Sequence, residues 1–320
     1  MTVTVGIDIG GSSVSAVALD ERGQAIGRHE SNVAVEGGHQ VVSAALAALR
    51  ALDLDGFQAV GVGVPGQVDP GNGQVTMAVN LGIGPQPYDL ADELETALGY
   101  PVTIENDVRA AALGAYESLH SSGGRPDSVA LVSIGTGISA GVVVQGLLVR
   151  GSRGMAGEIG HVVVDETGVV CRCGQRGCLE AVAAGPAIAR AWPKGETGTA
   201  ATALFSAAAA GDPAAEKVAD RITGHLTTAL IWLAAAYDSE VVVLAGGVAG
   251  AGEPFLNLVR EQVRRRGAAS ELVARRLPPD RVILADPDDP PGPRGAALLA
   301  ARRILQTREA PAGTKAGNDT

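Results

Sequence analysis

Residues 5–19 read VGIDIGGSSVSAVAL: an apolar strand, a glycine turn preceded by an aspartate, and a second apolar strand. Short β-branched runs on either side of a glycine turn predict a β-hairpin. Residues 131–144, LVSIGTGISAGVVV, repeat the strand, turn and strand but lack the aspartate. Because repetition of one such unit indicates a duplicated architecture, the sequence predicts two similarly built halves.

Strands and helices alternate along the rest of the chain, as is typical of an α/β protein. Further strands are expected at residues 59–64, 101–104 and 241–244, and helices at 40–52, 89–98, 108–119, 213–237 and 294–305. We therefore expect a smaller N-terminal α/β domain at 1–118 and a larger C-terminal one at 119–293, with helix 294–305 packing back on the first. Residues 307–320, rich in Ala, Gly, Thr and charge, are expected to be a disordered tail.

Composition excludes several classes of function. The chain has 320 residues, enough for two cores, and its 35 acidic against 25 basic side chains give a net charge of −10. That charge repels phosphate backbones, so no nucleic-acid partner is expected. No signal peptide is visible, and the apolar runs break well before the roughly 18 residues of a membrane span, so we expect a cytoplasmic protein without a membrane partner.

Glycine turns follow apolar strands at three places, and they can hold phosphate because backbone N–H groups approach an anion closely where no Cβ intervenes. Each turn alone is also consistent with an ordinary hairpin, but the three together favour nucleotide binding. Asp8, beside the first turn, is expected either to hold Mg²⁺ through water or to cap the turn. The turn residues are Gly10, Gly11 and Ser12, then Gly135, Thr136 and Gly137, then Gly246 and Gly247.

Two segments match a dinucleotide-binding fingerprint without its context. Residues 61–66, GVGVPG, and 135–140, GTGISA, have the required spacing. The fingerprint must open a helix, whereas the first segment runs into a proline and the second into a β-branched strand. The motif GxxxxGK[ST] is also absent from the sequence. These observations argue against a Rossmann oxidoreductase and against a P-loop kinase.

Asp107 ends the segment Glu105-Asn106-Asp107, which lies between an expected strand and an expected helix. At that place an aspartate can simply cap the helix. The functional alternative is a general base, since phosphoryl transfer to a hydroxyl requires a carboxylate that accepts the hydroxyl proton. Asn106, which is both donor and acceptor, suits a sugar hydroxyl.

All three cysteines fall in Cys171-Arg-Cys173-Gly-Gln-Arg-Gly-Cys178, shortly after His161. Three thiolates and one imidazole make the Cys₃His set of a closed, structural zinc site. Glu158 and Glu180 flank these ligands, so zinc would fix two carboxylates suited to vicinal sugar hydroxyls. The alternative is that both are ordinary surface charges.

These motifs together resemble the ROK family (repressor, open reading frame, kinase) of bacterial sugar kinases and regulators. The resemblance implies the actin-like ATPase (ribonuclease H-like) fold, with nucleotide in a cleft between two α/β domains. It also implies transfer of the ATP γ-phosphate to a hexose, usually at the 6-hydroxyl. The matching segments are DIGGSS at 8–13, GVGVPGQVD at 61–69, ENDVRAAALG at 105–114, IGTGISAGVVVQG at 134–146, RGMAGEIGH at 153–161, CRCGQRGCLE at 171–180 and LAGGVAGAG at 244–252.

The resemblance also assigns roles to single residues. Asp8 and the turn at 10–12 look like the first phosphate loop, the turn at 135–137 the second, and Gly246 and Gly247 the adenosine contact. Asp107 looks like the catalytic base, and His161 is expected to serve sugar and zinc through its two ring nitrogens. The implied sugar ligands are Gly66, Asn106, Asp107, Glu158, His161 and Glu180, and the implied zinc ligands His161, Cys171, Cys173 and Cys178.

The sugar is less well specified, because the chain departs from the family pattern near the sugar site. Leu81-Gly82-Ile83-Gly84 stands where the family often has a tryptophan, and Gln145 replaces a more usual asparagine. We expect a glucokinase-like enzyme using ATP, Mg²⁺ and structural Zn²⁺, with an N-acetylglucosamine or N-acetylmannosamine kinase as the alternative. A homo-oligomer, dimer or tetramer, is also expected.

Two further alternatives belong to other classes of protein. A ROK regulator would add a DNA-binding helix-turn-helix before the first phosphate strand, and that strand already begins at Val3. A catalytically silent sugar-binding protein would not need Asp8, the glycine turns and Asp107 together. The sequence thus favours an enzyme.

Overall fold

The computed structural model describes residues 2–193 and 198–309, which form two compact units. The first unit holds Met1–Asp107 and Ala296–Thr320, and the second holds Val108–Gly295. The first division thus falls at residue 107 rather than after 118, which gives helix α3 (Asp107–Ser121) almost entirely to the second unit. The physical reason is close packing, because a Cβ added at Gly141 in strand β9 would lie 2.7 Å from Cβ of Ala112 in α3.

The first unit is built on a five-stranded sheet of order β3-β2-β1-β4-β7. Strands β1 and β2 pair antiparallel with Ile9 opposite Val14, which confirms the predicted hairpin. Strand β4 pairs parallel with β1 on one side and with β7 on the other. The strands are β1 (Thr4–Ile9), β2 (Val14–Leu19), β3 (Ala25–Ser31), β4 (Ala59–Val64) and β7 (Val102–Asn106).

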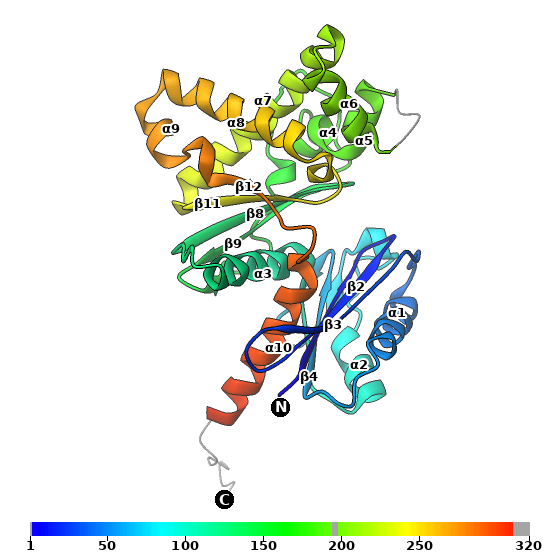
Figure 1. The fold of residues 1–320 in the computed structure, drawn as a ribbon. Helices are drawn as coiled ribbons and strands as arrows, with labels where there is room; N and C mark the ends of the chain where they lie inside the picture. Colours follow the sequence, from blue (N-terminus) through cyan, green and yellow to red (C-terminus); the bar gives the residue numbers. More distant parts are fainter. Residues whose placement is uncertain (1, 194–197, 310–320) are drawn as a thin grey trace, which may run out of the picture. The chain divides into compact units, whose positions relative to one another are not determined.

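Helices cover both faces of this first sheet (Figure 1). Helices α1 (Gly38–Ala51) and α2 (Leu90–Leu98) bury Val41 and Leu94 in the main core of the unit. The other face receives the part of α10 (Pro291–Glu309) that belongs to this unit, where Ala297 packs against Val17 and Leu19. Short elements complete the unit: β5 (Gln67–Val68), β6 (Val75–Thr76) and η1 (Val79–Leu81).

The second unit repeats the same sheet plan, with strand order β10-β9-β8-β11-β12. Its first three strands are antiparallel, and β8, β11 and β12 are parallel, as in the first unit. This confirms the predicted internal repeat. The strands are β8 (Ser128–Ile134), β9 (Ile138–Val144), β10 (Leu147–Leu148), β11 (Val241–Ala245) and β12 (Val282–Leu284).

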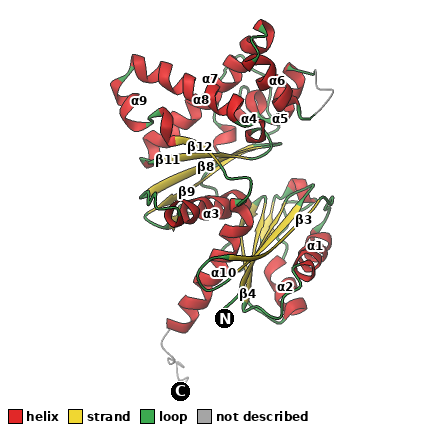
Figure 2. Cartoon of the chain, viewed as in Figure 1, coloured by secondary structure: helices red, strands yellow, loops and turns green. Residues whose placement is uncertain are grey.

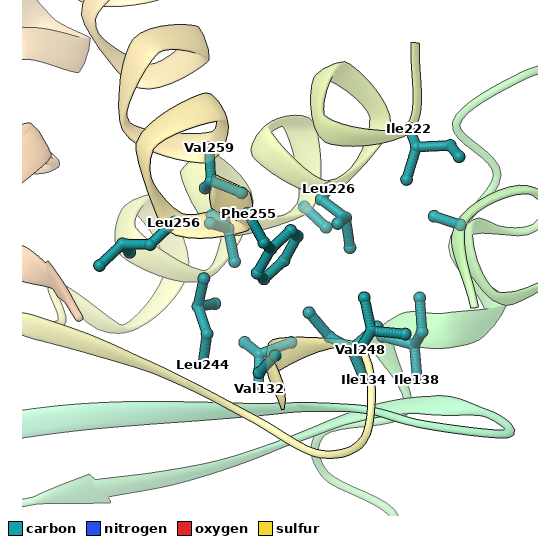
Figure 3. Close-up of a cluster of buried hydrophobic side chains, with 14 of the residues drawn as sticks. Val132, Ile134, Ile138, Ile222, Leu226, Leu244, Val248, Phe255, Leu256 and Val259 are labelled. Carbon is teal, nitrogen blue, oxygen red and sulfur yellow. The ribbon is translucent and has the colours of Figure 1, made fainter. Parts of the chain in front are cut away.

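One face of the second sheet carries α3, and the other carries a thick layer of helices (Figure 2). Figure 3 shows its core, where Leu226 of α7 and Phe255 of α8 point toward Val132 of β8. Helix α7 spans the predicted residues, and Asp212 caps it by accepting hydrogen bonds from the N–H groups of Ala214 and Ala215. The remaining elements are η2 (Ile159–His161), α4 (Leu179–Ala183), α5 (Gly185–Ala191), α6 (Ala200–Ala209), α7 (Pro213–Tyr237), η3 (Ala249–Ala251), α8 (Glu253–Ala269), α9 (Glu271–Arg276) and η4 (Pro279–Arg281).

The last helix is longer than expected at both ends. Helix α10 begins at Pro291 and continues to Glu309, so the prediction of a tail starting at 307 is wrong for residues 307–309. A proline suits the first helical turn because its missing N–H would be unsatisfied there anyway. The rest of the expected tail, 310–320, lies outside the described residues. Within residues 2–193 and 198–309, no helix is both long and apolar enough to cross a bilayer.

Candidate functional site

In the first unit, the sheet brings two candidate segments to one edge. Asp8 of β1 lies opposite Gly63 of β4, and Gly63 lies opposite Glu105 of β7. These strands are parallel, so their carboxyl ends share an edge, where ligands of open α/β sheets bind. The turn after β1 and the Asn106-Asp107 segment after β7 therefore lie at the same edge.

Asp8 and Asp107 are close enough to influence each other electrostatically. Burial, and then the negative charge of Asp107, raise the pKa of Asp8 from 3.8 to about 8. A second carboxylate nearby disfavours ionisation because like charges repel. A dication would relieve that repulsion, so the two side chains fit the carboxylate environment that Mg²⁺ prefers.

Asn106 fixes the orientation of Asp107. Its Nδ2 donates to Oδ1 of Asp107 at 2.9 Å and to the carbonyl oxygen of Gly66 at 3.2 Å. Helix α3 begins at Asp107, where a carboxylate also interacts favourably with the helix dipole. Three predicted residues of this unit are thus in direct contact, and the geometry is compatible with both interpretations of Asp107.

The first glycine turn is tight and open to solvent at its tip. The N–H of Gly10 donates to the carbonyl oxygen of Ser13 at 2.9 Å, and Ser12 is exposed. The other N–H groups of such a turn can face an anion. Only Ile9 separates Asp8 from this turn, so the predicted metal-binding carboxylate and the predicted phosphate turn lie next to each other.

In the second unit, two glycine turns lie side by side. They follow β8 and β11, which are neighbours in the sheet, with Ser133 opposite Ala245. The N–H of Val248 donates to the carbonyl oxygen of Ile134 at 2.9 Å. Gly246, at φ +87°, packs so closely on Ile134 that a Cβ would lie 2.6 Å from its carbonyl oxygen. The predicted second phosphate turn and adenosine contact are therefore adjacent.

Glu180 contacts the predicted second phosphate turn. Its Oε2 accepts a hydrogen bond from the N–H of Ile138 at 3.2 Å. A Cβ at Gly137 would lie 2.5 Å from the same oxygen, so a larger residue there would displace the Glu180 carboxylate. A predicted sugar ligand and a predicted phosphate turn are thus joined within one unit.

The four predicted zinc ligands converge. The ligand atoms of His161, Cys171, Cys173 and Cys178 all lie within 4.8 Å of one another. Cys171 Sγ is 3.7 Å from His161 Nδ1, and Cys173 Sγ is 3.5 Å from Cys178 Sγ. Zinc–sulfur bonds of about 2.3 Å in a tetrahedron require separations of about 3.8 Å, so the set fits zinc.

The pKa values of the Cys173 and Cys178 thiols are shifted in opposite directions. A hydrogen bond from the backbone N–H of Gln175 is the main cause that lowers the pKa of Cys173, to about 6. Burial, and then hydrogen bonding with Cys173, raise the pKa of Cys178 to about 12. A bound zinc ion would displace the thiol protons because zinc binds thiolates.

The remaining predicted residues of this unit lie near the cysteine cluster. Glu158 is exposed and precedes η2, and the N–H of His161 donates to its carbonyl oxygen at 3.2 Å. His161 directs Nδ1 toward Cys171, which leaves Nε2 for another partner. A backbone hydrogen bond thus links Glu158 to His161, one of the predicted zinc ligands.

Sequence reasoning missed three charged residues. Glu105 is only 1% exposed and accepts a hydrogen bond from the N–H of Asn106 at 2.9 Å. Arg109 is 3% exposed and donates to the carbonyl oxygen of Gly154 at 2.6 Å. Arg172 approaches Glu180 within 3.7 Å. Each lies inside a quoted motif, but only the structure shows that Glu105 and Arg109 are buried and that Arg172 lies near Glu180.

Comparison with known proteins agrees with this arrangement, since the ROK family matches residues 4–303. The chain belongs to the ROK family. A ROK family glucokinase from Streptomyces griseus, solved in complex with glucose and AMPPNP, is 30% identical with a TM-score of 0.76, covering 94% of this chain and 99% of that one. The fold is therefore the actin-like ATPase fold.

Relatives of the ROK chain include kinases for different sugars. The glucokinase of Thermotoga maritima is 35% identical over 278 residues, 81% of this chain and 86% of that protein. The N-acetylmannosamine kinase of Yersinia pseudotuberculosis is 34% identical over 242 residues, 76% of this chain and 82% of that protein. Overall identity does not separate these substrates.

Proposed function

We propose that this protein is an ATP-dependent hexose kinase that transfers the γ-phosphate of ATP to the 6-hydroxyl of a hexose, with glucose favoured. The observation that carries the proposal is the edge of the first sheet, where Asp8 and the Asn106–Asp107 pair meet a glycine turn. Membership of the ROK family and the printed activities of its relatives support the same reaction.

Asp107 is the catalytic base in this proposal. The hexose hydroxyl oxygen forms a bond to the γ-phosphorus, the bond from that phosphorus to the ADP oxygen breaks, and the hydroxyl proton passes to Asp107. Such a base contributes roughly 10²- to 10⁴-fold to the rate. The amide of Asn106, at 2.9 Å, holds the carboxylate in one orientation for this transfer.

Asp8 would hold Mg²⁺, directly or through water. The metal would neutralise charge that builds on the phosphates. The raised pKa of Asp8 supports this role because a buried carboxylate beside a second one is stabilised by a cation. Binding of the metal would therefore release a proton from Asp8 at neutral pH.

The glycine turns would bind the nucleotide. Backbone N–H groups at 10–12 and 135–137 would face phosphates, and Gly246 with Gly247 would contact adenosine. The adjacency of the last two segments within the second unit supports this division of labour. Backbone donors suit a chain whose net charge is −10, because they need no extra cations.

Zinc would be structural in this enzyme. Three thiolates and the Nδ1 nitrogen of His161 fill a tetrahedral site, leaving no position for substrate. The bound metal would hold Glu158 and Glu180 near the hexose, and Nε2 of His161 would bind the sugar as well. With Gly66, Asn106 and Asp107, these residues make the proposed sugar ligands.

Glucose is the favoured hexose, and an N-acetylhexosamine, N-acetylglucosamine or N-acetylmannosamine, is the second candidate. The segment Leu81-Gly82-Ile83-Gly84, which departs from the family pattern, leaves the second candidate open. An N-acetylmannosamine kinase among the relatives supports it. A sugar-sensing regulator is less well supported, since it would not need the base at Asp107.

A reducing compartment suits this cysteine set, because thiolates that bind zinc must not form disulfides. We therefore propose a cytoplasmic enzyme. We further propose a homo-oligomer, either dimer or tetramer, and the net charge of −10 disfavours a nucleic-acid partner. Light scattering with size-exclusion chromatography would measure the oligomeric state, and a monomeric mass would contradict it.

A coupled assay of ADP release over a panel of hexoses tests the proposal. We expect release with ATP and Mg²⁺ in the presence of glucose, and smaller or no release with N-acetylmannosamine and N-acetylglucosamine. Product analysis should place the phosphate on the 6-hydroxyl. Absence of ADP release with every hexose, from protein of full zinc content, would contradict the assignment as a kinase.

A further inference from the structure

Arg172 is placed between two zinc ligands and beside a carboxylate that faces the phosphate turn. Its Nη2 lies 3.7 Å from Oε1 of Glu180, while Oε2 accepts the N–H of Ile138 at 3.2 Å. The Glu180 side chain is 16% exposed, whereas that of Arg172 is 72% exposed. One oxygen of Glu180 therefore accepts a backbone hydrogen bond, and the other forms an ion pair with Arg172.

A carboxylate needs two contacts to have one orientation. The last torsion of glutamate is broad, so the single bond from Ile138 leaves the carboxylate free to rotate about it. The positive charge of the Arg172 guanidinium, 3.7 Å from the other oxygen, attracts that oxygen and so favours one orientation of the carboxylate. Arg172 thereby determines which lone pairs of Glu180 remain for a ligand.

The surroundings connect this pair to the phosphate turn. A cavity with a volume of about 480 Å³ is lined by Thr136 of that turn together with Arg172, Glu180 and Arg190. The second arginine serves a different purpose, since Nη2 of Arg190 donates to the carbonyl oxygen of Ala181 at 2.9 Å. Of these two arginines, Arg172 is the one that forms an ion pair with Glu180 in the described part of the chain.

The backbone at Arg172 is held by the turn of the cysteine cluster. The N–H of Cys171 donates to the carbonyl oxygen of Gln175 at 2.7 Å, and the N–H of Gly174 donates to that of Cys171 at 2.9 Å. Zinc bound by the flanking cysteines would stiffen the same turn. The long, exposed side chain of Arg172 therefore starts from a fixed point.

We propose that Arg172 is a positioning residue that acts through Glu180 to set the affinity for hexose. This proposal rests on the proposed function, in which Glu180 accepts hydrogen bonds from the sugar. Arg172 touches neither the sugar nor the reacting atoms. Its effect is confined to the orientation of one carboxylate, so it changes KM for hexose and leaves KM for ATP unchanged.

Steady-state kinetics of Arg172→Ala test the inference. Because exposed ion pairs are weak, we expect KM for hexose to rise about two- to fivefold, with unchanged kcat, KM for ATP and zinc content. Arg172→Lys keeps the charge and should recover about half of the loss. Arg190→Ala, which removes a cation from the same cavity, is the matched control and should leave KM for hexose unchanged.

Ionic strength separates positioning from a general effect on folding. Arg172 is mostly exposed, so about 1 M salt, with a Debye length near 3 Å, should screen its attraction to Glu180. The KM values of wild type and Arg172→Ala should then converge. A difference that persists at high salt, or an equal change in Arg190→Ala, would overturn the proposal.

Glu180→Gln distinguishes failure of this inference from failure of the proposed function. If Glu180 binds sugar, the variant raises KM for hexose, and adding Arg172→Ala to it changes KM no further. An unchanged KM in Glu180→Gln would remove Glu180 from the sugar site and with it the basis of the proposal. A raised KM there, with additive effects in the double variant, would overturn the role of Arg172 alone.

Discussion

The two units share one sheet plan but use its equivalent hairpin turns differently. Asp8 and Ser133 occupy matching positions, each one residue pair before the turn, since Ile9 pairs with Val14 and Ile134 with Ile138. The first unit has a carboxylate there and a second one, Asp107, nearby. The second unit has a hydroxyl instead. In the proposed function, the duplicated framework would thus carry metal and proton chemistry in one copy only.

In the second unit, a residue outside the hairpin contacts the hairpin turn. Glu180 binds the N–H of Ile138, and the cysteine cluster directly precedes Glu180 in the chain. The first hairpin has no counterpart of this cluster among the described residues. The comparison teaches that the shared sheet plan sets where the turns lie, while segments outside the sheet determine which side chains surround each turn.

Asp107→Asn tests the proposed catalytic base of the first unit and should have the largest effect on turnover. We expect kcat to fall about 10²- to 10⁴-fold because amide nitrogen cannot accept the proton. Zinc content and Tm should not change, since the amide is nearly isosteric. Ser133→Ala, at the position equivalent to Asp8 in the second unit, is the control and should retain most activity. Near wild-type turnover of Asp107→Asn would remove Asp107 from the role of base.

Cys173→Ser would test the support of the second unit. Loss of one ligand opens the site, so we expect loss of zinc by elemental analysis and a fall in Tm of about 10 °C or more. Glu166→Gln, on the exposed loop before the cysteines, is the control. A variant that keeps full stability while containing no metal would refute a structural zinc site.

Asp8→Asn would test how much the buried negative charge of Asp8 lowers the free energy of unfolding. Folding raises the pKa of Asp8 to about 8 from 3.8, so the folded state binds the extra proton and stability falls as pH rises across that window. The variant in metal-free protein should therefore be more stable than wild type at pH 9, by on the order of 2 kcal/mol, and no more stable at pH 3. Denaturant unfolding at both pH values measures this difference, and an equal effect at both would contradict it.

Gly137→Ala would test the contact between the second turn and Glu180. The new Cβ would meet Oε2 of Glu180 at 2.5 Å and displace the carboxylate, so kcat/KM for hexose should fall about tenfold. Gly56→Ala is the control, because nothing lies within 4 Å of its new Cβ. Unchanged kinetics in Gly137→Ala would show that the position of Glu180 is not critical.

Local patterns predicted most elements, and the exceptions have a physical cause. The first hairpin and α7 were predicted correctly because their apolar residues recur at the strand and helix periods. Strand β3 was missed because it is an edge strand without a buried face, held by backbone pairing to β2. Helix α8 was missed because its charged residues mask a narrow apolar stripe that includes Phe255 and Val259.

The sequence by itself determined the chemistry of the segments. The cysteine spacing, the glycine turns and the Glu105-Asn106-Asp107 segment depend on residues close in the chain, so local pattern suffices to identify them. The same holds for the approach of His161 to the cysteines, because the intervening loop is short.

Only the tertiary structure decided which segments meet. Asp8 and Asp107 lie at the same edge of the first sheet because β1, β4 and β7 pair in parallel register. These strands are far apart in the sequence. Glu180 reaches Ile138, and Arg172 reaches Glu180, through folding of the cysteine cluster onto the second sheet. Register and packing are set by the whole core, because no local pattern specifies contacts between distant segments.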